Sequence, residues 1–153
     1  MAVEYDLESD TEADLAEIRE FFAAAIEGDA GPDGTVFRNG MYVMTYRLDP
    51  EDEESTIEHF GFRHRITATY RFSNLADPAV RDHNTALMVR SVLQFTERFG
   101  GHGVLLFNGE EATIQWTPDE VVFGSDWPEW TEVRPVIPLL TGHAIGPLPQ
   151  PLL

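Results

Sequence analysis

The pattern that most restricts the fold of this chain lies between residues 102 and 117. Val104 to Phe107 is a continuous apolar run, and it is followed by Asn108-Gly109. This residue pair favours a tight two-residue hairpin, because both central positions of that turn take positive φ. The alternate positions after it are apolar: Ala112, Ile114 and Trp116. The pattern predicts a hairpin whose first strand is buried on both faces of a sheet.

The remaining segments extend this hairpin into a mixed fold. Strands are expected at 3–8, 35–38, 41–48, 60–72 and 121–123, where apolar and polar residues alternate or apolar residues cluster. Helices are expected from Ser9–Thr11 as cap to Gly28, and from Asp77-Pro78 to Phe99. The order is strand-helix-strand-strand-strand-helix-strand-strand-strand. It predicts an α+β domain with a mostly antiparallel sheet and two helices packed on one face.

The predicted strand 60–72 carries Arg63, Arg65 and Arg71 on one face. One interpretation is a phosphate-binding patch. The interpretation we favour is cross-strand pairing with the acidic outer face of strand 3–8. His64 falls on the apolar face, where a hydrogen-bonded core histidine is more common than a ligand.

The last twenty residues suggest a separate segment. Five of residues 134–153 are prolines, and most of the others are apolar. This composition does not suit a helix, a central strand or a free linker. We therefore expect a single domain over residues 1–133 and a proline-rich tail over 134–153 packed on it, near Met41 and Val43. Docking of the tail to another domain is the alternative.

Charge limits the possible partners. The chain has 27 acidic and 10 basic residues, all of the latter arginine, and a formal net charge of −17. Such a field repels nucleic acid and anionic membranes and favours a basic protein partner. Solubility or adaptation to high salt explains the same charge without a partner. Since no signal-peptide pattern or long apolar run is present, we expect a cytoplasmic protein.

Sequence motifs for catalysis or metal binding are not found. The chain has no cysteine or lysine, and its five histidines do not have the spacing of metal ligands. The acidic run from Asp49 to Glu58 lacks the register of a calcium loop. We therefore expect no metal and no cofactor. A small enzyme with a polar site near His64 stays as the alternative, because catalytic residues can assemble from distant positions.

Three segments together resemble a known family. They are Met1 to Leu7, Gly101 to Glu110 with its Leu-Leu-Phe-Asn-Gly-Glu, and Trp127 to Trp130. In these segments the chain resembles the Sit-type (swarming-inhibition) immunity proteins of myxobacteria and actinobacteria. The resemblance implies a polymorphic-toxin immunity protein, which neutralises a cognate toxin by binding and not by catalysis.

Candidate contact residues follow from charge and exposure. Acidic residues on the first helix and in the 49–58 segment would meet a basic toxin, and tryptophans beside a proline would either cap the core or anchor a partner. The candidates are Glu12, Glu17, Glu20, Asp52, Glu53, Glu54, Trp127 and Trp130.

Overall fold

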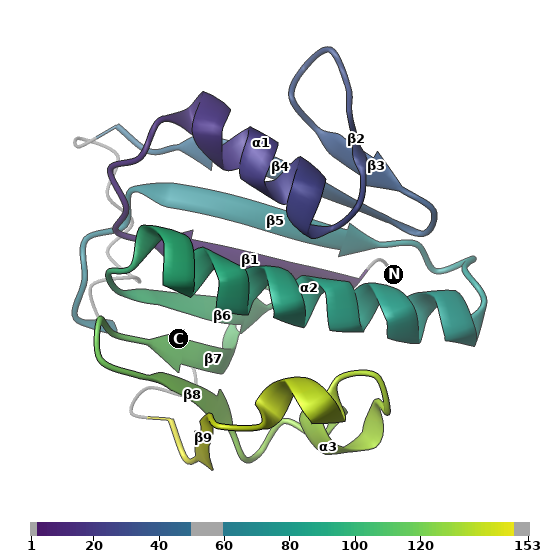
Figure 1. The fold of residues 1–153 in the computed structure, drawn as a ribbon, viewed down its shortest axis with the longest axis vertical. Coiled ribbons are helices and arrows are strands. Elements are labelled where there is room, and N and C mark those ends of the chain that lie inside the picture. The colour runs from purple at the N-terminus through teal and green to yellow at the C-terminus, as the bar shows by residue number, and fades with distance from the viewer. Residues whose placement is uncertain (1–2, 50–59, 149–153) are drawn as a thin grey trace.

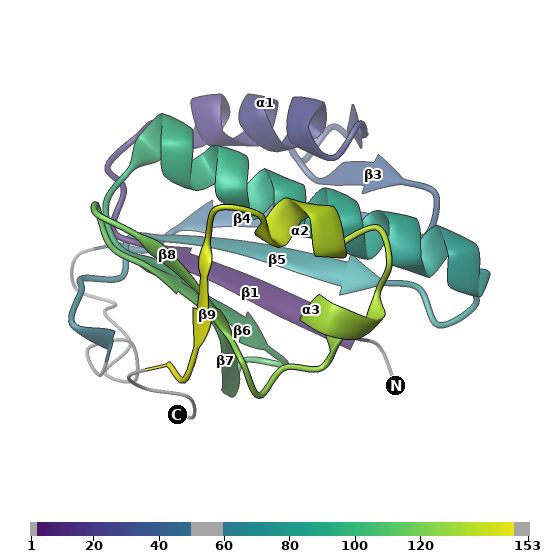
Figure 2. The same ribbon diagram turned by 60° about the horizontal axis from the view of Figure 1, so that its bottom comes forward.

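A nine-stranded sheet forms one layer and two long helices form the other in the computed structural model, which describes residues 3–49 and 60–148 (Figures 1 and 2). Both helices lie on the same face of the sheet, as Figure 2 shows. Neighbouring strands are antiparallel except β8 and β9, which are parallel. The predicted α+β fold, with its mostly antiparallel sheet and two helices on one face, is confirmed.

The sheet has the order β2-β3-β4-β5-β1-β6-β7-β8-β9, so β1 lies at its centre. The strands are β1 Val3–Ser9, β2 Asp29–Ala30, β3 Val36–Arg38, β4 Met41–Arg47, β5 Ile66–Phe72, β6 Gly103–Phe107, β7 Glu111–Trp116, β8 Val121–Gly124 and β9 Ala144–Gly146. The helices are α1 Leu15–Ala25, α2 Pro78–Phe99, the short α3 Glu129–Glu132 and the 3-10 helix η2 Ile137–Leu140. The short elements β2, β9, α3 and η2 are additions to the predicted order.

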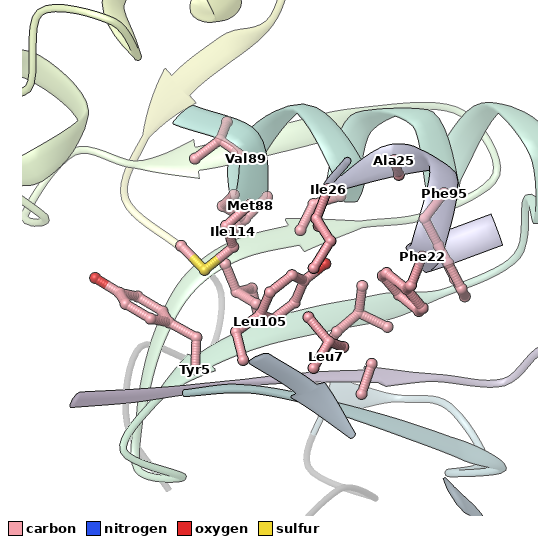
Figure 3. Close-up of a cluster of buried hydrophobic side chains, with 14 of the residues drawn as sticks. Tyr5, Leu7, Phe22, Ala25, Ile26, Met88, Val89, Phe95, Leu105 and Ile114 are labelled. Carbon is pink, nitrogen blue, oxygen red and sulfur yellow. The ribbon is translucent and has the colours of Figure 1, made fainter. Parts of the chain in front are cut away.

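The main core fills the space between helices and sheet (Figure 3). Tyr5 and Leu7 of β1 face the helices and are 2% and 0% exposed, as their alternation with acidic residues predicts. Phe22 of α1 stacks on Phe95 of α2, with ring centroids 5.9 Å apart. These contacts fix both helices against the centre of the sheet.

The hairpin predicted for residues 102–117 is present as β6 and β7. Asn108 and Gly109 both have positive φ, 50° and 74°, and the Glu110 N–H donates to the Phe107 carbonyl. Leu105 belongs to the main core. Val104 and Leu106 point to the other face, where they pack with Phe62 and Leu148 in a smaller cluster. The expectation that this strand is buried on both faces is therefore confirmed.

Helix α1 begins later than its sequence suggests. Its N-cap is Asp14. Of the residues expected to cap it, Ser9 is the last residue of β1, and Asp10 and Thr11 follow the strand. The Ser9 carbonyl accepts a hydrogen bond from the Arg65 N–H at 2.9 Å, and the Ser9 hydroxyl accepts one from the Thr11 N–H. The predicted cap is wrong because Ser9 is held in the sheet by pairing with β5 and β6, so the helix starts only after Asp14.

Strand β5 is shorter than the predicted strand 60–72, because it begins at Ile66. Gly61 has a positive φ of 78°, and the chain turns there. Phe62 then packs beneath β6 with Val104 and Leu106 instead of continuing the strand. The segment just before β5 thus covers part of the sheet face that the helices leave open.

The proline-rich segment lies at the β9 edge of the sheet, whereas Met41 and Val43 belong to β4 on the other side of the central strand β1. β9 pairs with β8, and Val136 and Leu140 enter the main core. Met41 and Val43 are 3% and 0% exposed, on the sheet face that α1 contacts at β4. The expected packing near Met41 and Val43 is wrong, because α1 already occupies that surface.

Candidate partner-binding surfaces

The acidic candidates near α1 are exposed but partly paired. Glu17 contacts Arg98 at 3.1 Å, whereas Glu20 is exposed and has no ion-pair partner among the residues described. Glu12 precedes the helix instead of lying on it, and its carboxylate contacts Arg65 at 3.1 Å. Exposed ion pairs contribute little stability, so these carboxylates can exchange partners. Asp52, Glu53 and Glu54 lie outside the described residues.

The two tryptophans differ in their surroundings. Trp130 is 1% exposed, and its indole N–H donates to the Thr113 carbonyl at 3.0 Å. This placement favours the core-capping alternative for Trp130. Trp127 is partly buried, and its ring centroid lies 4.7 Å from that of Phe107 and 6.2 Å from that of Tyr5.

Trp127 also lines a hollow of about 270 Å³ between β7, β8 and the loop that follows β8. Glu111 and Asp126 contribute carboxylates to this hollow, and Ala112 and Leu148 contribute apolar surface. Of the two tryptophans, Trp127 is the one with surface available to a partner.

Acidic and hydroxyl side chains pair across β1 and β5 on the open face, the sheet face away from the helices. Glu4 contacts Arg71 at 3.2 Å, and the Thr69 hydroxyl donates to Asp6 at 2.7 Å. Arg71 is therefore paired with the first strand, as the favoured interpretation of the arginines predicts. Arg65 turns to Glu12 instead, so the arginines do not form a single phosphate patch.

A buried polar cluster lies deeper on the same face. His64 Nε2 contacts the Glu8 carboxylate and lies 2.7 Å from the Thr67 hydroxyl, which donates to Glu8 at 2.6 Å. His64 and Glu8 are only 3% and 6% exposed. Burial raises the pKa of the Glu8 carboxyl, and the hydrogen bond from His64 opposes this shift. The cluster confirms that His64 is buried and hydrogen-bonded, but His64 lies on the open face and not on the expected apolar face, because β5 begins only at Ile66.

One surface was missed as a site by the sequence reasoning. Phe37, Tyr42, Met44 and Tyr46, which we call the aromatic strip, lie together on the open face of β3 and β4. Phe37, Met44 and Tyr46 are 50%, 39% and 51% exposed. The signal was the shared parity of Tyr42, Met44 and Tyr46, but parity alone does not show whether a helix covers a strand face.

Within residues 3–49 and 60–148, no group of three or more histidine, aspartate or glutamate side chains is placed to hold a metal ion. None of the helices in these ranges is long and apolar enough to cross a membrane.

The fold and its surfaces define a class: an acidic α+β domain with exposed carboxylates and an exposed aromatic strip, and with its histidine–carboxylate cluster buried. The chain belongs to the SitI3-like family, whose model matches residues 3–134. This is a family of the Sit immunity type, in agreement with the resemblance in the sequence. No curated protein and no solved structure matches the chain.

Proposed function

We propose that this chain is a non-enzymatic immunity protein that binds a cognate toxin and neutralises it in the cytoplasm. Membership of the SitI3-like family is the observation that carries the proposal. The net charge of −17 supports a basic toxin, because opposite charge speeds association and disfavours acidic competitors.

The proposed steering surface is acidic. Glu17 and Glu20 are exposed on α1, and Glu12 is exposed just before it. Together with Asp52, Glu53 and Glu54 they would attract a basic protein over a distance of about a Debye length, roughly 8 Å at physiological salt. Trp127 adds a partly exposed aromatic ring beside Glu111 and Asp126.

Co-expression tests the function directly. The product of the gene adjacent to this one is expressed alone and together with this chain in a host that lacks both. We expect growth arrest in the first case, and rescue with co-purification in the second. An unrelated acidic protein of similar size serves as the control for charge. Toxicity that persists in the presence of this chain would contradict the proposal.

Stoichiometry then separates binding from catalysis. An inhibitor that acts by binding protects only up to a molar ratio near one, whereas an enzyme protects at far lower ratios. Titration of the purified toxin with this chain measures that ratio. The alternative is an enzyme with a polar site near His64. It is less well supported, because His64 and Glu8 are buried and both are hydrogen-bonded to the Thr67 hydroxyl.

A further inference from the structure

The aromatic strip is the largest gathering of exposed apolar side chains in the part of the chain that the structure describes. Three of the six large hydrophobic side chains exposed there belong to it, and the other three are separate in sequence: Leu75, Ile137 and Ile145. Phe37 lies directly opposite Tyr42, and their ring centroids are 5.8 Å apart. Exposed aromatic clusters of this kind are typical of protein-binding surfaces.

A carboxylate borders the strip on its outer side, and an arginine–glutamate ion pair borders it on its inner side. Asp29 of β2 is exposed and lies opposite Phe37, so its side chain shares the open face at the sheet edge. Toward the sheet centre, Tyr42 lies opposite Arg71, which lies opposite Glu4. The Arg71 and Glu4 side chains are 44% and 36% exposed, so their ion pair is open to water.

The strip also has a recess at one end. A hollow of about 380 Å³ lies beside the turn between β3 and β4, and Phe37, Tyr42 and the two arginines Arg38 and Arg71 contribute to its lining. Binding energy at interfaces concentrates where an anchoring side chain fills such a recess and is shielded from water. The strip thus offers flat aromatic surface, a recess and the exposed carboxylate of Asp29 at its outer edge.

From these features we infer that the aromatic strip is the surface that holds the toxin, and that the toxin presents arginine side chains among apolar ones there. This inference rests on the proposed function. The guanidinium group of arginine stacks on aromatic rings and pairs with carboxylates in the same contact, which suits the Phe37 and Tyr42 rings beside Asp29. A second copy of this chain is a poor occupant, because each copy carries a net charge of −17.

The strip and the acidic residues near α1 lie on opposite faces of the sheet, so they have separable roles. Exposed charges mainly set the association rate and its salt dependence, whereas buried aromatic anchors mainly set the dissociation rate. The toxin is steered by the acidic surface and is retained by the strip.

Dissociation rates of single variants test this role. The probe is the purified product of the adjacent gene, immobilised for surface plasmon resonance. We expect Tyr46→Ala and Phe37→Ala each to speed dissociation about tenfold or more, with association changed less than about twofold. Ile145→Ala is the matched control, since Ile145 is 50% exposed on β9 at the other end of the sheet. Thermal melting of each variant checks that it is folded.

Two substitutions at one position test the chemistry of the occupant. Met44→Arg places a cation at the centre of the strip, and Met44→Glu places an anion there. A toxin that presents arginines should lose about tenfold more affinity with Met44→Arg than with Met44→Glu. Equal losses would overturn the inferred arginines. Sedimentation of the chain alone completes the test, because self-association abolished by Tyr46→Ala would assign the strip to a second copy.

The outcomes separate this inference from the proposed function. If the wild-type chain protects cells while Tyr46→Ala and Phe37→Ala dissociate like the control, the docking surface is wrong and the function stands. If the wild-type chain neither binds nor protects, the proposed function fails and the inference fails with it.

Discussion

His64 Nε2 contacts the Glu8 carboxylate beneath the sheet, and the Thr67 hydroxyl hydrogen-bonds to both. A histidine beside a carboxylate is a common catalytic arrangement, but here both side chains are buried. Through His64 Nε2, the Thr67 hydroxyl and the Glu8 carboxylate, the cluster joins β1, β5 and the segment that precedes β5. The pair therefore holds the open face of the sheet together.

The titration of Glu8 should be visible in stability. Burial raises the pKa of its carboxyl above the usual 4.5, so the folded state binds this proton more tightly than the unfolded state does. The contribution of Glu8 to stability is therefore fully present below about pH 4.5 and is lost as pH rises through the folded pKa.

Glu8→Gln removes this titration and keeps the shape of the side chain. The unfolding free energy of the variant minus that of the wild type should therefore increase as pH rises above 4.5. The total increase is about 1.4 kcal/mol for each pH unit by which folding raises the pKa of Glu8. Urea unfolding of both proteins between pH 4 and pH 8 measures the difference. A difference that does not change with pH would show that Glu8 has no raised pKa.

Gly103 allows β6, the first strand of the 102–117 hairpin, to pass beneath Trp116. A Cβ at this position would overlap the Trp116 ring and lie 2.7 Å from the Glu8 carbonyl oxygen. Gly103→Ala should therefore lower the unfolding free energy by about 1–3 kcal/mol, as overpacked cores do. The control is Gly146→Ala, where a Cβ meets nothing within 4 Å and the expected change is below about 0.5 kcal/mol. Chemical denaturation of both variants compares them, and equal losses would rule out the contact with Trp116 as the cause.

Asp52, Glu53 and Glu54 test the electrostatic part of the proposed function. Changing all three to arginine should slow association with the toxin by about tenfold or more, and the effect should shrink at high salt. Stopped-flow mixing at low and high ionic strength gives these rates.

A matched variant controls for net charge alone. Glu97, Asp119 and Glu120 are exposed around another hollow, and reversing them changes the net charge by the same amount. This control should slow association much less. Wild-type association that does not depend on salt would contradict electrostatic steering altogether.

The two tryptophans should separate stability from binding. Trp130→Phe leaves the buried Thr113 carbonyl without its donor, which should cost about 1–3 kcal/mol of unfolding free energy and leave toxin dissociation unchanged. Trp127→Ala removes a partly exposed ring and should speed dissociation. If Trp130→Phe instead weakens binding while its melting temperature is preserved, Trp130 is a contact residue.

Local sequence predicted most of the elements, because their signals are local. Asn108-Gly109 encodes a turn through its tolerance of positive φ, and the alternation in β1 encodes which side chains face the core. The errors occurred where distant segments compete for the same residues. Ser9 has the chemistry of a helix cap, but its carbonyl accepts a hydrogen bond from Arg65, 56 positions later in the chain.

The candidate binding surfaces were likewise only partly predictable from the sequence. The acidic candidates come from the sequence alone, since net charge depends only on composition. It did not identify the aromatic strip, because Met44 and Tyr46 are exposed only when α1 packs on the other face of β4 and leaves theirs open.

The sequence by itself determined the α+β class, the hairpin of β6 and β7, the acidic charge and the family of this protein. Only the tertiary structure decided that the His64–Glu8 pair is buried, that Trp130 belongs to the core and that the aromatic strip faces solvent. The physical reason is that burial depends on which face of a strand is covered. That is decided by packing between segments far apart in the chain, and no local pattern contains it.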